Sequence, residues 1–110
     1  MSAIFVLTNL PDSEAAFNLA GDLVHLRLAA CVNVLSPVTS FYRWAGAMER
    51  ATEHPLLIKS TAERYPALEA AIRERHPYSV PEIVAWPIER GLPEYLAWIA
   101  AECRSEDGAA

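Results

Sequence analysis

TSFYRWAGAMERATEHPLLIKS, residues 39–60, is the stretch of sequence that decides the fold. Residues 39–44 are rich in β-branched and aromatic side chains, Ala-Gly-Ala at 45–47 suits a tight turn, and residues 48–60 return as a second strand ending in apolar residues. The pattern predicts a β-hairpin whose arms exceed the length of about five or six residues usual for a strand. A small domain cannot bury such arms, so we expect the end of the hairpin to project from the body.

The chain before the hairpin begins with a predicted strand and helix. Residues 4–7 form a short apolar run that ends in Thr-Asn-Leu-Pro at 8–11, which is typical of a buried strand followed by a turn. Asp12 or Ser13 can then cap a helix. Apolar residues recur at spacings of three and four after this cap, so we expect an amphipathic helix to about Leu28.

The first arm of the hairpin is predicted to begin well before residue 39. Residues 31–35 alternate in polarity and are rich in β-forming side chains, and residues 39–44 resume that pattern after Pro37. We therefore expect one long strand with a bend or bulge at Ser36-Pro37.

The segment after the hairpin reads as helix, strand and helix. A helix starting close to Pro66 must end near residues 75–76, because Pro77 follows. Residues 82–86 are Glu-Ile-Val-Ala-Trp, apolar after the first, and predict a strand; residues 93–99 predict a short final helix.

This order, β-α-β-β-α-β plus a C-terminal helix, predicts an α+β fold of the ferredoxin-like (split β-α-β) sandwich type, with both main helices on one face of an antiparallel sheet. The projecting hairpin exposes strand edges together with Phe41, Tyr42 and Trp44. Such edges are stable when they are paired or covered, and pairing with copies of the same chain in a closed ring is the economical solution. We therefore expect a homo-oligomer.

Length and composition fit one compact domain. The 110 residues are 53% hydrophobic and 21% charged, so we expect a single domain over residues 1–110, with an ordered core over about 3–104 and a flexible tail. The net charge of -5 argues against a nucleic-acid partner, and no run approaches the roughly 20 apolar residues needed to span a membrane. The N-terminus lacks secretory-signal features and only Cys31 and Cys103 occur, so we expect free thiols and a cytoplasmic location.

Five sequence blocks resemble the CutA divalent-cation tolerance family. The blocks are LAACVN at 28–33, FYRWAG at 41–46, LIKST at 57–61, HPYSVPEI at 76–83 and YLAWI at 95–99. They occur in the family's order, and the likeness runs from about Ile4 to Cys103. The resemblance implies a ferredoxin-like subunit in a tight homotrimer, similar in fold to PII-type signalling proteins, and a role in tolerance of copper and other divalent metals.

His76 is the candidate metal ligand. In the family that the chain resembles, a metal site has been associated with two adjacent histidines before Pro-Tyr and with a cysteine at the end of the first strand. Those positions here hold Arg75, His76 and Thr8. A neutral imidazole can bind a soft divalent metal, but a histidine at a helix end more often lies there without one, and a neighbouring guanidinium repels a cation. We expect weak binding of a divalent metal such as copper, and no obligatory cofactor.

A small-ligand pocket is predicted from polar groups and an aromatic wall. Its candidate residues are Cys31, Trp44, Lys59, Tyr78, Glu82 and Trp98. Lys59 and Glu82 each lie at an end of an otherwise apolar strand, and the resemblance implies that such residues gather near subunit interfaces. The alternatives are a plain Lys59–Glu82 salt bridge, aromatic side chains that only anchor the oligomer, and a Cys31 that only fills the core.

Several functions compete with that of a non-catalytic trimeric binding or signalling protein. A metal chaperone of this fold needs Cys-x-x-Cys after the first strand, and residues 8–11 contain no sulfur. An enzyme using the cleft between subunits needs a nucleophile and a base, for which Cys31 and His76 are the candidates, without a supporting motif. A structural scaffold that docks other proteins on its trimer faces stays open as an alternative.

Overall fold

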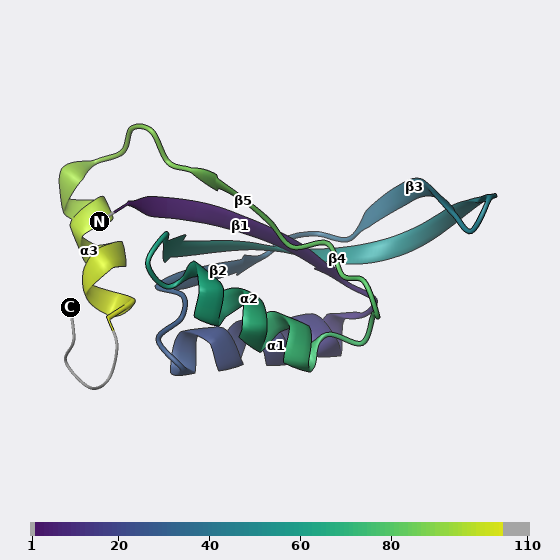
Figure 1. Cartoon of the computed structure of the whole chain (residues 1–110), viewed down its shortest axis with the longest axis horizontal. Coiled ribbons are helices and arrows are strands. Elements are labelled where there is room, and N and C mark those ends of the chain that lie inside the picture. The colour runs from purple at the N-terminus through teal and green to yellow at the C-terminus, as the bar shows by residue number, and fades with distance from the viewer. Residues whose placement is uncertain (1, 105–110) are drawn as a thin grey trace.

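An antiparallel sheet with two helices on one face forms the body of the molecule (Figure 1). The computed structural model describes residues 2–104. Its elements are β1 (Ala3–Leu10), α1 (Ser13–His25), β2 (Cys31–Val34), β3 (Val38–Trp44), β4 (Ala47–Thr61), α2 (Tyr65–Arg75), β5 (Val84–Pro87) and α3 (Pro93–Glu102). The strand order β2-β4-β1-β5, with antiparallel pairs throughout, confirms the predicted split β-α-β fold. The tail predicted to be flexible lies outside the described residues.

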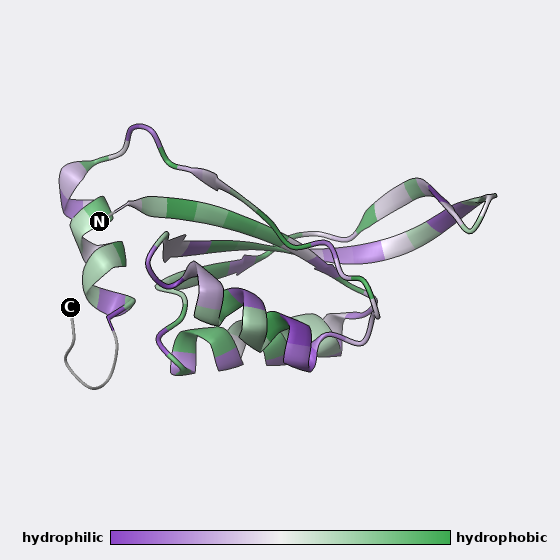
Figure 2. Cartoon of the chain, viewed as in Figure 1, coloured by the Kyte–Doolittle hydropathy of each residue, from purple (hydrophilic) through white to green (hydrophobic). Residues whose placement is uncertain are grey.

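The core lies between the sheet and the pair α1 and α2. Every second residue of β1 faces the helices, and the buried side chains of α1 recur at the predicted spacings of three and four. The largest fully buried apolar side chains of this core are Val6, Leu10, Leu23, Leu56, Ile58, Leu68 and Ile72. Hydrophobic colour accordingly follows β1 and the second half of β4, whereas polar colour dominates the first half of β4 (Figure 2). Each such side chain stabilises the fold by about 1.5–3 kcal/mol.

α1 begins where the sequence predicts and ends earlier. The Asp12 carboxylate accepts a hydrogen bond from the Ala15 amide at 2.8 Å, which is an N-cap. The helix stops at His25 instead of about Leu28 because Arg27 takes a φ of +59°, which turns the chain out of the helix. This turn places the Leu28 carbonyl 2.6 Å from the hydroxyl of Ser60, which donates to it.

The predicted irregularity at Ser36-Pro37 is confirmed, and it divides the expected long strand into β2 and β3. β2 pairs with β4 up to Val34–Leu56, and β3 resumes the pairing at Val38–Glu53. Three residues on one side therefore lie opposite two on the other, which is a β-bulge. Pro37 has no amide with which to continue the ladder.

The hairpin of β3 and β4 projects from the body as predicted (Figure 1). It closes through the two-residue turn Ala45-Gly46, with φ values of +51° and +82°, which are typical of a type I′ turn. All residues from 41 to 50 are exposed, including Phe41 at 65% and Trp44 at 57%.

α3 lies beyond the other end of the sheet, away from the hairpin (Figure 1). Its Ile99 packs with Ala30 and Cys103 in a second, smaller core. β5 begins at Val84, two residues later than expected, and the Glu82 side chain ahead of it accepts a hydrogen bond from Asn9. None of the helices in residues 2–104 combines the length and the apolar character needed to cross a membrane.

Candidate functional site

The face of the sheet opposite α1 and α2 carries a row of chemically varied side chains. The strand register places Cys31 opposite Lys59, Lys59 opposite Phe5, and Phe5 opposite Trp86. Residues that are direct partners across strands point to the same side of a sheet. The rings of Phe5 and Trp86 lie 5.6 Å apart. A thiol, an amine and two aromatic rings therefore cross this face in one line.

Lys59 holds the centre of a polar cluster on this row. Its Nζ lies 3.6 Å from Sγ of Cys31 and donates a hydrogen bond to Oδ1 of Asn33. Cys31 is half-buried and carries a free thiol. None of the ion pairs formed within residues 2–104 includes Lys59. The amine is thus held by a cysteine sulfur and an amide oxygen, and the alternative of a Lys59–Glu82 salt bridge is not realised.

α3 brings two aromatic residues to the same cluster. Burial raises the pKa of the Tyr95 hydroxyl above its ordinary value, and the neighbouring Cys31 side chain raises it further. The Tyr95 and Trp98 rings lie 5.6 Å apart. Of the predicted pocket residues, the structure therefore gathers Cys31, Lys59 and, through Tyr95, Trp98.

His76 is buried at the end of α2, and backbone groups engage both of its ring nitrogens. Nε2 lies 2.6 Å from the Asn9 carbonyl oxygen, and Nδ1 accepts from the Tyr78 amide at 3.2 Å. Since Nδ1 accepts, the neutral ring carries its proton on Nε2 and donates it to Asn9. Burial lowers the pKa of His76, and the Asn9 hydrogen bond and the charge of Glu53 offset part of that effect. Neither nitrogen has a free lone pair in this arrangement.

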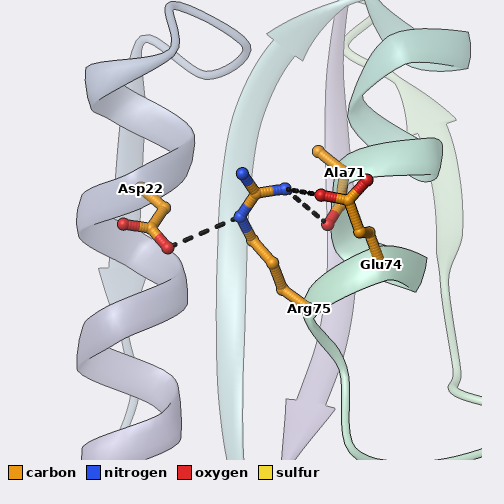
Figure 3. A network of polar contacts seen from close by, with 4 residues as sticks. All are labelled: Asp22, Ala71, Glu74 and Arg75. Atoms are coloured by element: carbon orange, nitrogen blue, oxygen red, sulfur yellow. Dashed lines mark hydrogen bonds and ion pairs between the residues drawn. The ribbon is translucent and has the colours of Figure 1, made fainter.

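The other two positions matched to the family's metal site also point elsewhere. Figure 3 shows the Arg75 guanidinium reaching across to α1, where Nε lies 3.5 Å from Asp22, while Nη1 contacts Glu74 and the Ala71 carbonyl. It therefore acts as a brace between the two helices. Thr8 is fully buried, and its hydroxyl has no hydrogen-bond partner within residues 2–104. Over the same residues, no three His, Cys, Asp or Glu side chains gather as a metal site would require.

Tyr78 and Glu82 belong to a second cluster, built around Asn9. The Glu82 carboxylate accepts a hydrogen bond from the Asn9 amide nitrogen at 2.8 Å, and the Tyr78 ring lies 4.8 Å from that of His76. Burial and the nearby Glu53 carboxylate raise the pKa of Tyr78. Sequence reasoning missed Asn9, because Thr-Asn-Leu-Pro signals a turn and gives no sign of long-range contacts.

Trp44 stands apart from both clusters, next to the turn of the projecting hairpin. The six predicted pocket residues therefore do not form one pocket within a single chain. A cavity of about 280 Å³ at the end of the sheet near α3 is lined by none of them; its walls are Ser2, Ala3, Thr61, Pro87, Ile88, Leu96 and Ala100. A pocket containing all six requires more than one chain.

Comparison of the sequence with known proteins gives matches along nearly the whole chain. Residues 4–102 match the family model described as CutA1 divalent ion tolerance protein. The chain is 47% identical over 94 residues to the divalent-cation tolerance protein CutA of Thermus thermophilus, covering 86% of this chain and 91% of that protein. It is 42% identical over 99 residues to a CutA homolog of Xenopus laevis, with 90% of this chain and 64% of that protein covered.

A solved structure extends the likeness to three dimensions. The structure of CutA from Archaeoglobus fulgidus, described as a periplasmic divalent cation tolerance protein, superposes with a TM-score of 0.89 at 37% identity, covering 93% of this chain and 99% of that one. Sequence and fold therefore agree along nearly the whole chain, which belongs to the CutA1 divalent ion tolerance protein family.

Proposed function

We propose that this protein is a non-enzymatic homotrimer that supports tolerance of copper and other divalent cations by binding or signalling. Its relatives carry divalent-cation tolerance in their names. The observation that carries the proposal is the exposed hairpin. Phe41, Trp44 and Met48 are 57–67% exposed on a ribbon with no further strand on the β3 edge among residues 2–104. Such an edge is stable when another chain pairs with it or covers it.

Three chains in a closed ring provide this cover with one repeated contact. The hairpin of one chain would reach the body of the next and carry Trp44 towards the clusters around Lys59 and Asn9. Clefts between chains would then combine the six predicted pocket residues. A small ligand or a weakly held divalent ion would bind there.

The separation of thiol and imidazole supports a non-enzymatic role. Cys31 contacts Lys59, whereas His76 is engaged by Asn9 and Tyr78, so the candidate nucleophile and base do not meet within one chain. A nucleophile needs its base within hydrogen-bond reach. Both cysteines are free thiols, which supports a reducing, cytoplasmic location that cell fractionation would check.

Copper challenge tests the proposal directly. A strain lacking its own CutA protein should regain growth on copper when it expresses this chain, and should not regain it with the hairpin variant Phe41→Glu. Phe17→Glu, a change on α1 at a residue of similar exposure, is the matched control and should restore growth. Rescue by a Phe41→Glu protein shown to be monomeric would contradict the trimer as the working form.

Calorimetric titration tests the weak-metal part. Copper should bind with low affinity, because the described residues offer no set of three ligands and both nitrogens of His76 are engaged. Tight stoichiometric binding that survives His76→Ala would show a copper site elsewhere and overturn this part.

A further inference from the structure

Cys31 and Lys59 are direct partners on the adjacent antiparallel strands β2 and β4. Their side chains leave the same face of the sheet, and Sγ lies 3.6 Å from Nζ. We propose that this pair is a modification site, at which a peroxide converts the thiol and the amine into a reversible nitrogen–sulfur crosslink. A short movement of either side chain brings the two atoms to bonding distance.

The amine is well placed for this reaction. Asn33, two residues after Cys31 on the same strand, accepts a hydrogen bond from Nζ and thereby holds the amine beside the sulfur. Lys59 takes part in no ion pair with a carboxylate of residues 2–104. A carboxylate partner would draw Nζ away from the sulfur, and none among these residues does so.

The two cysteines of the chain differ in their surroundings. Cys31 is half-buried at the start of an edge strand, so a molecule as small as hydrogen peroxide can reach its sulfur. Cys103 is 2% exposed in the small core under α3, and burial raises the pKa of its thiol. Since the thiolate is the nucleophile, Cys103 should react slowly and serves as an internal reference.

The chemistry balances in two steps. The Cys31 thiolate attacks one peroxide oxygen, so that a sulfur–oxygen bond forms and the oxygen–oxygen bond breaks, giving a sulfenic acid and, after proton uptake, water. The sulfur is oxidised by two electrons and the peroxide is reduced. The unprotonated Lys59 amine then attacks the sulfenic sulfur, so that a nitrogen–sulfur bond forms and the sulfur–oxygen bond breaks. The hydroxide that leaves takes a proton from the nitrogen and becomes a second water. The chain has then lost two hydrogen atoms, and a thiol reductant restores both side chains.

The crosslink would have two consequences. It would tie β2 to β4 at the first pair of their ladder, whose last pair, Val34–Leu56, precedes the bulge from which the hairpin extends. It would also consume the sulfenic acid before more peroxide oxidises it irreversibly to sulfinic and sulfonic acids. Lys59 would thus protect Cys31 under oxidative conditions.

Mass spectrometry of the intact, peroxide-treated protein tests the proposal. The expected product is a single chain lighter by two hydrogen atoms, with the Cys31 and Lys59 peptides joined in the digest and separated again by dithiothreitol. The Cys103→Ser variant should give the same product, which distinguishes the crosslink from a disulfide within the chain. If that variant is less stable, the joined Cys31 and Lys59 peptides in the digest of the unmodified protein give the same distinction.

Lys59→Gln is the decisive control, because it retains a long polar side chain but lacks the amine. In this variant dimedone should trap a sulfenic acid at Cys31, and prolonged treatment should convert Cys31 to sulfinic and sulfonic acids. Equal overoxidation in both proteins, a doubled mass from a Cys31–Cys31 disulfide, a linkage that retains oxygen, or an unreactive Cys31 would each overturn the proposal.

Discussion

The Nε2 atom of His76 lies 2.6 Å from the carbonyl oxygen of Asn9, and this contact ties the end of α2 to the end of β1. The Asn9 side chain in turn bonds Glu82 ahead of β5. Asn9 thus joins three segments that are far apart in the sequence, close to the base of the projecting hairpin. The imidazole therefore has a structural task that does not require a metal.

The buried imidazole predicts a pH dependence of stability. Because the folded pKa of His76 lies below the unfolded value of about 6.5, the unfolded chain binds the proton first as the pH falls. The stabilisation is complete above that value and is lost below it, by at most about 1.4 kcal/mol per pH unit, until the folded pKa is reached.

His76→Gln isolates this contribution, since a glutamine amide can donate to the Asn9 carbonyl but does not titrate. Chemical denaturation of both proteins between pH 5 and 8 should show a steeper acid loss in the unmodified protein. Parallel curves would show that His76 is not the titrating group.

The hairpin predicts which exposed phenylalanine matters for assembly. Phe41 on β3 and Phe17 on α1 are 65% and 62% exposed in one chain. Phe41→Glu should dissociate the oligomer, because burying an unpaired carboxylate at an interface is costly, whereas Phe17→Glu should leave the oligomer intact. Size-exclusion chromatography with light scattering distinguishes the two, and dissociation by Phe17→Glu alone would place the interface on α1.

Replacing glycine by alanine should change stability in opposite directions at Gly46, in the hairpin turn, and at Gly21, in α1. A Cβ at either Gly46 or Gly21 meets nothing within 4 Å, so only the backbone differs. Gly46→Ala should cost about 1 kcal/mol because Gly46 has a φ of +82°. Gly21→Ala, inside α1, should stabilise by roughly 0.5–1 kcal/mol. Thermal denaturation checks both, and a loss of stability at Gly21 would contradict the helical account.

The helix-to-sheet core predicts a large effect at Ile72. Its side chain is fully buried on the face of α2 that packs into the core, and Ile72→Ala should lower the free energy of unfolding by about 2–5 kcal/mol. Val80→Ala, at a residue 69% exposed, should change it by less than about 0.5 kcal/mol. Comparable losses from both in denaturant titrations would contradict the assigned core.

Local sequence patterns were sufficient to predict most of the fold. Strand and helix order, the long hairpin and the irregularity at Ser36-Pro37 follow from periodicity, proline and turn residues, which act on near neighbours in the chain. The early end of α1 was not predictable, because it depends on a left-handed residue, Arg27, that is neither glycine nor asparagine.

The candidate site was predictable in its residue types but not in its grouping. Which side chain Lys59 meets depends on the register of β2 against β4, and that register is set by the core on the other face of the sheet. The sequence therefore singled out Lys59, Cys31, Tyr78 and Glu82 without showing that they form two clusters. Arg75 was expected beside His76, but Asp22 on the neighbouring helix draws its guanidinium across to α1.

Sedimentation equilibrium of the unmodified protein at low micromolar concentration tests the central claim most directly. The account predicts one species with three times the mass of a single chain, because the ribbon of residues 41–50 is exposed in one copy and must be covered by others. A stable, well-behaved monomer at that concentration would contradict it.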